Sequence, residues 1–115
     1  MSNTNLLISI VICTADRSAS LQKTLASLNH INYNSNYNSF EVIVVDSSDD
    51  DSTLKMINLL KNNLTFSIKI LTSQPKNISI SRNIGIQKSS GKIIAFIDDD
   101  AIPPTDWLDK LISTY

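Results

Sequence analysis

The chain is poor in the residues that mark several common classes of protein. Its 115 residues include two glycines, Gly85 and Gly91, and a single cysteine, Cys13. One cysteine excludes an internal disulfide and, within an apolar run, is most simply a small buried apolar residue. Neither basic nor acidic residues are in excess, because the formal net charge is −1. We therefore expect no general attraction to nucleic acid or to an anionic membrane.

Long apolar runs are absent too. No stretch approaches the length of about 20 apolar residues that a membrane-spanning helix needs, so no transmembrane segment is predicted. The first five residues lack the basic start of a secretion signal. Together with the lone cysteine, this favours the reducing cytoplasm, with the protein free or peripheral to the inner membrane. A hydrophobic content of 42% and this length predict one domain, residues 1–115.

What the chain does contain is four apolar runs of strand length. They are rich in β-branched residues, as strands are, and they cover residues 6–13, 40–45, 66–71 and 93–97. Apolar residues at helical spacing lie between these runs and after the last one. Apolar strands that alternate with helices predict an α/β fold with a doubly wound, mostly parallel sheet covered on both faces. The polar stretch 32–39 is expected to be a surface loop.

Capping residues indicate where the four helices begin. Ser18 is the candidate N-cap of the first helix, and Asn77 and Thr105 are the candidates for the third and fourth. The second helix is expected to start near Asp51. The helical spacing also places Ile80 and Ile84, followed by Gln87, along one side of the third helix.

The shortage of glycine excludes two familiar ways of binding phosphate. The first turn after a strand, residues 14–18, contains no glycine. A dinucleotide-binding turn needs glycines so that its backbone can approach a pyrophosphate, and a P-loop needs a glycine-rich cradle. A phosphorylated ligand would therefore have to be neutralised in another way. A divalent metal held by carboxylates is the obvious candidate.

Carboxylates gather where the last apolar run stops. Asp98, Asp99 and Asp100 follow directly after Ile97, and ligands of open α/β sheets bind just beyond the carboxyl ends of the strands. Three adjacent carboxylates repel one another unless a cation lies among them, and Mg²⁺ or Mn²⁺ prefers oxygen ligands. A solvated acidic turn that caps the next helix is the alternative. The strand directly before the triplet favours the metal site.

Other charged residues are expected at the same edge of the sheet. Arg17 follows the first apolar run, Asp46 follows the second, and Arg82 lies in the third predicted helix. Asp46 could accept hydrogen bonds from a ribose hydroxyl or a base N–H, or it could form an Asx-type turn with the two serines after it. Arg82 could meet phosphate or a base, or could be a solvated helix residue. The acids at 49–50 more simply favour a helix start.

Four short segments follow one another in a telling order. Residues 8–17 end in a T-x-x-R turn, residues 44–53 contain V-V-D with further acids, residues 81–86 read S-R-N-I-G-I, and residues 91–100 end in the acidic triplet. In this order and at this spacing they resemble the start of a family 2 glycosyltransferase with the GT-A fold, whose DxD motif the triplet resembles. There are departures: Cys13 stands where the family usually has a proline, and two serines replace an Asp-Gly pair after the second strand.

The resemblance implies roles for residues in these segments. The nucleotide-sugar-binding residues would be Thr14, Arg17, Asp46, Arg82, Asp98 and Asp99. The metal ligands would be Asp98 and Asp100. Asp46 would read the base, and Asp99 could substitute for either neighbour. The cofactor would be Mn²⁺ or Mg²⁺, and the donor a nucleotide-diphosphate sugar, most often a UDP-sugar. The ion would stabilise the nucleoside diphosphate as it leaves.

The resemblance also implies what this chain does not supply. In complete family members an acceptor site and a catalytic Asp or Glu base lie further on, and the base deprotonates the acceptor hydroxyl in an inverting transfer. No residue here matches that base. We therefore expect no catalytic residue in this chain, an incomplete GT-A domain that is the donor-binding part, and little or no transfer by the chain alone. The acceptor would be a saccharide, a lipid or a protein, with cell-envelope polysaccharide as the expected setting.

Two other functions stay open. A non-catalytic nucleotide-sugar-binding or partner module would keep the donor pocket without a base. A Mg²⁺-dependent phosphohydrolase or a receiver-like domain would also place Asp at strand ends. Those proteins need a nucleophilic Asp after an early strand and a supporting Lys late in the chain. Asp46 could imitate the first, but no lysine convincingly supplies the second.

Overall fold

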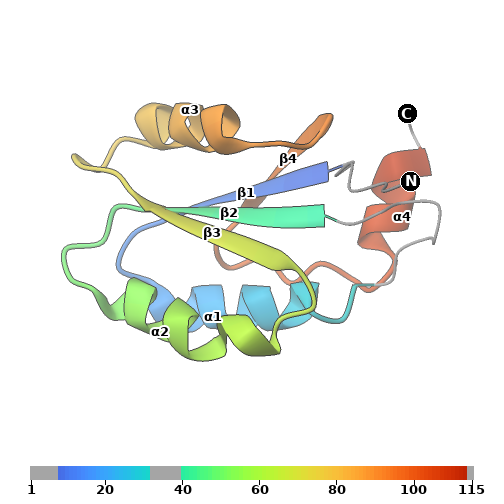
Figure 1. Cartoon of the computed structure of the whole chain (residues 1–115), viewed down its shortest axis with the longest axis horizontal. Helices are drawn as coiled ribbons and strands as arrows, with labels where there is room; N and C mark the ends of the chain where they lie inside the picture. Colours follow the sequence, from blue (N-terminus) through green and yellow to red (C-terminus); the bar gives the residue numbers. More distant parts are fainter. Residues whose placement is uncertain (1–7, 32–39, 114–115) are drawn as a thin grey trace.

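A four-stranded parallel sheet forms the centre of the chain (Figure 1). The computed structural model describes residues 8–31 and 40–113. The strands are β1 (Ile8–Thr14), β2 (Phe40–Asp46), β3 (Ser67–Thr72) and β4 (Ile93–Asp98), in the spatial order β3-β2-β1-β4. The predicted α/β fold with a parallel sheet is confirmed. The expected strand residues 6–7 and the expected loop 32–39 lie outside the described part of the chain.

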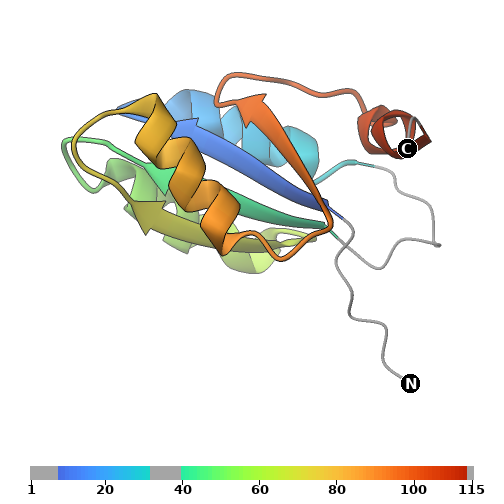
Figure 2. The ribbon, with the colours of Figure 1, turned by 90° about the horizontal axis from the view of Figure 1, so that it is seen from above.

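Helices connect the strands and cover both faces of the sheet. They are α1 (Ser18–Leu28), α2 (Ser52–Leu60) with the short 3-10 helix η1 (Lys61–Asn63), α3 (Ile78–Lys88) and α4 (Trp107–Ser113). Helices α1 and α2 lie on one face of the sheet and α3 on the other (Figure 1). Seen from above, α3 crosses the sheet over β1 and β2 (Figure 2). In the described residues, the helices are all too short or too polar to cross a membrane.

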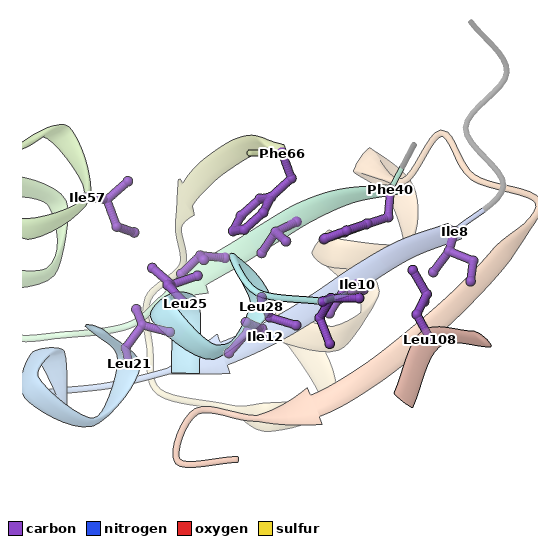
Figure 3. Packing of buried hydrophobic residues seen from close by; sticks show 13 residues of the cluster. Ile8, Ile10, Ile12, Leu21, Leu25, Leu28, Phe40, Ile57, Phe66 and Leu108 are labelled. Atoms are coloured by element: carbon purple, nitrogen blue, oxygen red, sulfur yellow. The ribbon is translucent and has the colours of Figure 1, made fainter. Parts of the chain in front are cut away.

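The two faces of the sheet are packed unequally. The face toward α1 and α2 holds a large apolar cluster (Figure 3). Its buried members are Ile8, Ile10, Ile12, Leu21, Leu25, Leu28, Ile31, Phe40, Val42, Val44, Ile57, Phe66 and Leu108. The face toward α3 holds a small one, of Val11, Ile43 and Val45. Because strand side chains alternate between faces, β1 and β2 are apolar at almost every position, which is why their sequences read as unbroken apolar runs.

Helix α3 approaches β1 closely because it carries a glycine at the contact. A Cβ on Gly85 would collide with Cγ1 of Val11, which is fully buried. The glycine therefore lets the helix lie directly on the strand. One turn earlier, Ser81 is also buried and lies 3.4 Å from the hydroxyl of Ser47 at the end of β2. The close packing thus brings the first turns of α3 to the carboxyl edge of the sheet.

The same face of α3 explains why only part of a prediction holds: Ile84 packs against the small apolar cluster, but Ile80 is exposed. The buried positions of α3 are Ser81 and Gly85, so the helix turns this side to the sheet. Ile80 lies to the side of that face and is 43% exposed. The predicted cap of α3 is confirmed, since the backbone N–H of Ile80 donates to Oδ1 of Asn77 at 3.0 Å.

Two other helix starts differ from the predicted ones. Helix α1 begins at Ser18 itself, and its N-cap is Arg17, whose side chain makes no capping hydrogen bond. That arginine is engaged with the acidic triplet instead. Helix α4 begins at Trp107 rather than directly after Thr105, because a turn intervenes in which the N–H of Trp107 donates to the carbonyl of Pro104 at 3.0 Å.

A buried carboxylate closes the opposite, amino end of the sheet. Glu41 is 1% exposed. It accepts hydrogen bonds from Oγ of Ser9 at 2.6 Å and the N–H of Ser90 at 2.7 Å, and Nζ of Lys69 lies 3.4 Å away. Burial by itself would raise the pKa of Glu41, but these partners outweigh it and hold that pKa below its usual value. Gly91 donates to Ser9 in turn, so Glu41 ties the turn before β4 to the first two strands.

Candidate functional site

The carboxyl ends of three strands meet at one edge of the sheet, where a pocket of about 330 Å³ opens. Thr14 at the end of β1 pairs with Asp46 of β2, and Cys13 pairs with Asp98 of β4. The acids that follow the second and fourth apolar runs therefore flank the end of β1, as the parallel sheet predicted. The pocket is lined by Cys13, Thr14, Ala15, Arg17, Ser47, Lys76, Asn77, Ile78, Ser81 and Asp99.

The middle acid of the triplet is an anchor. Asp99 is 6% exposed. Its carboxylate accepts a hydrogen bond from Oγ1 of Thr14 at 2.8 Å and pairs with a guanidinium nitrogen of Arg17 at 3.0 Å. Its backbone carbonyl accepts from Oγ1 of Thr24, a buried residue of α1, at 3.0 Å. Asp99 thus joins the end of β4 to the β1–α1 turn and forms one wall of the pocket.

The outer acids of the triplet are exposed. Asp98 and Asp100 lie on either side of the buried Asp99 and both reach solvent. A second nitrogen of Arg17 pairs with Oδ2 of Asp100 at 3.2 Å. One guanidinium therefore faces two carboxylates, with the third close by in the chain, so negative charge is in excess here. In residues 8–31 and 40–113, no three Asp, Glu, His or Cys side chains gather in a way that could hold a metal ion by themselves.

Asp46 lies at the predicted edge, but its side chain is already engaged. It is 4% exposed, and its Oδ1 accepts hydrogen bonds from the N–H of Ser48 at 3.1 Å and from the hydroxyl of the same serine. This is the Asx-type turn that the sequence left open as an alternative. Asp46 does not line either of the two pockets described here. At this end of β2, the residue that lines the larger pocket is the next one, Ser47.

A smaller pocket of about 150 Å³ lies beside the larger one and shares Cys13 and Ile78 with it. Arg82 and Asp98 line it together with Phe96, and the guanidinium carbon of Arg82 lies 5.8 Å from the centre of the Phe96 ring. That distance is within cation–π range. The predicted Arg82 and Asp98 are thus brought together, next to the site of Thr14, Arg17 and Asp99 rather than inside it.

Cys13 is less buried than its apolar run suggested. It is half-buried and lies between the two pockets. Partial burial raises the pKa of its thiol, Arg82 acts against this rise, and Asp99 adds to it.

Several residues of the site carried no functional signal in the sequence. Lys76 and Asn77 lie in the connection before α3, and Ser47 and Ser81 meet across the pocket floor. A positive φ of 56° at Asp16 is also invisible in sequence, although aspartate is one of the few residues that tolerate it. These positions become part of the site only through the packing of α3 on β1 and β2.

Comparison with known proteins gives consistent results. The sequence profile described as glycosyl transferase family 2 matches residues 9–115. The chain is 35% identical over 114 residues to the succinoglycan biosynthesis protein ExoM of Rhizobium meliloti, an alignment that covers 99% of this chain and 36% of ExoM. It is 28% identical over 114 residues to the glycosyltransferase AglE of Haloferax volcanii and spans 37% of that protein. The chain therefore spans little more than a third of the length of these relatives.

Solved structures share the fold. TarS of Staphylococcus aureus (residues 1–349, in complex with UDP-GlcNAc) superposes with a TM-score of 0.76 at 22% identity, over 94% of this chain and 30% of that one. The mannosyltransferase PcManGT of Pyrobaculum calidifontis, in complex with GDP-Man and Mn²⁺, superposes with a TM-score of 0.75 at 18% identity, over 87% of this chain and 29% of that one. At these identities the likeness shows the fold, which is the one the sequence resemblance implied.

Proposed function

Because the chain belongs to glycosyl transferase family 2, we propose that it binds a nucleotide-diphosphate sugar, a UDP-sugar, for transfer of the sugar to an acceptor hydroxyl. The observation that carries this proposal is the pocket at the carboxyl edge of the sheet. Thr14, Arg17 and Asp99 form its wall, and the exposed acids Asp98 and Asp100 border it. We assign residues 1–115 to donor binding, as one domain and the donor-binding part of a transferase, cytoplasmic or peripheral to the inner membrane.

The pocket suits a nucleotide better than a purely apolar ligand. Its wall offers the hydroxyls of Thr14, Ser47 and Ser81, and the side chain of Ile78 contributes an apolar surface. Arg17 can present guanidinium N–H groups to an anionic ligand. Arg82 lies in the adjoining pocket, where it can reach the same ligand. We retain Asp46 as the candidate reader of the base, which would require it to exchange its bond to Ser48 for one to the base.

A divalent cation fits the donor set at the border of the pocket. Magnesium and its relatives are commonly held by one or two carboxylates together with the phosphates of the substrate. Asp98 and Asp100 supply two exposed carboxylates, and a third protein ligand is not needed when a diphosphate shares the ion. When bound, Mn²⁺ or Mg²⁺ would supply Lewis-acid stabilisation of the nucleoside diphosphate. The Mn²⁺ in the PcManGT structure supports this assignment.

The chain's own residues then have distinct tasks in donor binding. Asp99 holds Thr14 and Arg17 in the pocket wall, and it can do so in the absence of any ligand. Arg17 offsets part of the negative charge of the acidic triplet before the anionic diphosphate binds. Without a cation, three carboxylates would repel a diphosphate, so the proposal requires that binding depends on the metal. The UDP and UDP-GlcNAc found with TarS support the choice of uracil.

Calorimetric titration with nucleotides tests the proposal. The chain is titrated with UDP, GDP and dTDP, each with and without Mn²⁺. We expect binding that requires Mn²⁺ and favours UDP. The doubly substituted variant Asp98→Ala with Asp100→Ala is the matched control, and it should lose the metal-dependent part. Binding that ignores Mn²⁺, or that survives in the double variant, would overturn the proposal. Metal-dependent UDP binding without any transfer by the whole protein would instead support a non-catalytic module.

A further inference from the structure

One lysine joins the three loops that surround the larger pocket. Lys76 lies in the connection between β3 and α3 and lines the pocket. Its Nζ is 2.7 Å from Oδ2 of Asp16 in the β1–α1 turn and 2.9 Å from Oδ1 of Asp49 in the β2–α2 loop. These pairs are short enough to be charge-assisted hydrogen bonds. They lower the pKa of Asp16 and raise that of Lys76.

The turn at Asp16 has a sparsely populated backbone conformation. Its φ of 56° lies in the left-handed region, which only glycine adopts freely, although aspartate tolerates it better than most residues. The N–H of Asp16 donates to Oγ of Ser48, and the N–H of Asp49 donates to Oδ1 of Asp16, both at 2.8 Å. Conformations of this kind persist only where the surroundings determine them. Here the determining contacts come from the neighbouring loop and from Lys76.

The next residue along the chain is the arginine of the site. The guanidinium of Arg17 pairs with the carboxylates of Asp99 and Asp100, yet 49% of the arginine side chain is exposed. Packing alone therefore does not fix its position. The direction in which Arg17 leaves the backbone is set by the turn at Asp16, so a change in that turn would move the guanidinium off the acidic triplet.

We propose that Lys76, together with Asp16 and Asp49, forms a loop clasp that holds the β1–α1 turn so that Arg17 and Thr14 stay in the pocket wall. Lys76 is then a positioning residue for the nucleotide sugar: it acts through Asp16 and makes no contact with the diphosphate. This inference rests on the proposed function for its effect on binding. The clasp itself is a property of the free chain and can be tested there.

Four variants of the chain separate the clasp from its alternatives. Lys76→Met removes the charge and keeps most of the stem, Lys76→Arg keeps the charge, and Asp49→Asn removes one partner. Lys55→Met is the matched control, because Lys55 also pairs with an aspartate, Asp51 at 3.4 Å on α2, away from the pocket. Affinity for UDP is measured with Mn²⁺ by calorimetry, and amide hydrogen exchange is measured on the free proteins.

The clasp predicts that losing either side of the Lys76–Asp49 pair weakens UDP binding. Lys76→Met should weaken it by about two- to fivefold, the size expected of a solvent-exposed ion pair. Asp49→Asn should also weaken it, Lys76→Arg should restore it, and Lys55→Met should leave it unchanged. In about 1 M salt, where the Debye length is about 3 Å, the difference between wild type and Lys76→Met should shrink.

Direct contact between Lys76 and the diphosphate predicts the opposite pattern. Asp49→Asn would then free the ammonium for the diphosphate and tighten UDP binding, whereas the clasp predicts that this variant weakens it. Tighter binding by Asp49→Asn overturns the clasp. In the free chain, the amides of Asp16 and Asp49 should exchange faster in Lys76→Met than in Lys55→Met, and equal rates would also overturn it. If wild type binds no nucleotide, the proposed function fails, and the exchange rates still decide the clasp.

Discussion

Both ends of the sheet hold acidic side chains, but the two ends differ in how far these side chains are buried and paired. At the amino end, Glu41 is buried, and a hydroxyl, a backbone N–H and an ammonium surround its carboxylate. At the carboxyl end, two of three consecutive aspartates, Asp99 and Asp100, share the guanidinium of Arg17, and the outer two of the three are exposed. The first carboxylate has all the partners it needs within the fold. The second group has more negative charge than the fold neutralises.

This difference separates a structural carboxylate from one available to a ligand. A buried charge must be paired, so Glu41 is used up in joining the turn before β4 to the sheet. Asp99 resembles it, because Thr14 and Arg17 satisfy it from inside the fold. Asp98 and Asp100 keep oxygen atoms in solvent, where a cation can reach them. Substitutions at one end of the sheet can therefore serve as controls for substitutions at the other end.

The largest effect is expected from the exposed acids. Replacing Asp98 and Asp100 together by asparagine keeps their size and removes two negative charges. Metal-dependent affinity for UDP should fall by at least about 10- to 100-fold, since changing even the groups that orient a metal's ligands costs that much. Calorimetric titration with Mn²⁺ present measures it.

The same double variant should leave folding unimpaired. Removing repulsion between exposed carboxylates should keep the free energy of unfolding within about 0.5 kcal/mol of wild type, or raise it slightly. A clear loss of stability would mean that these acids are structural like Glu41, and the contrast between the two ends would not hold.

Glu41→Gln should show the converse pattern. The amide oxygen can take the place of Oε2 and accept from Ser9 and Ser90, but the charge that faces Lys69 is lost, and the N–H₂ group then lies donor to donor against that ammonium. We expect a loss of about 1–3 kcal/mol in the free energy of unfolding, measured by urea denaturation. Affinity for UDP should be unchanged, and a variant that is stable but binds weakly would contradict the assignment of this end as structural.

The stability difference between wild type and Glu41→Gln should depend on pH. The pKa of Glu41 is lowered in the folded chain, so the folded state favours the ionised form. Its contribution is fully present above the unfolded pKa of about 4.3 and is lost as the pH falls through the lower folded pKa. Urea denaturation from pH 7 down to pH 3 should show the two proteins converging. A gap that widens toward acid would show that the sign is wrong.

The smallest effect is expected from Arg17→Lys. Lysine keeps the positive charge beside Asp99 and Asp100 but cannot bridge them with two nitrogens of one planar group. We expect a loss in UDP affinity of about two- to fivefold, and a change in stability within about 0.5 kcal/mol because Arg17 is half exposed. A loss as large as that of the double aspartate variant would place Arg17, rather than the acids, at the centre of binding.

The fold was largely predictable because its signals are local. Apolar runs of strand length, helical spacing and the cap at Asn77 each depend on a few neighbouring residues, and the structure has the predicted order of strands and helices. The parallel sheet also implied that Arg17, Asp46 and the triplet share one edge. The exposure of Ile80 could not be foreseen from the sequence. It follows from the close contact between Gly85 and Val11, which decides which side of α3 faces the sheet.

The division of labour within the site was less accessible. Nothing in three identical residues indicates that Asp99 turns inward to Thr14 while its neighbours stay exposed. The sequence likewise left two roles open for Asp46. The hydrogen bonds that its carboxylate accepts from Ser48 show that it forms the Asx-type turn. The role of Lys76 depends on loops that lie far apart in sequence and come together only when the sheet is formed.

The most direct test determines at which end of the sheet the metal binds. Mn²⁺ is paramagnetic, so in the presence of UDP it should broaden the backbone amide signals of nearby residues in an NMR spectrum of the chain. Because this broadening falls steeply with distance, we predict that it is strongest at Asp98, Asp100 and the β1–α1 turn and clearly weaker at Ser9, Glu41 and Ser90. Broadening centred on Glu41, or none at the acidic triplet when UDP and Mn²⁺ are both present, would contradict the central claim.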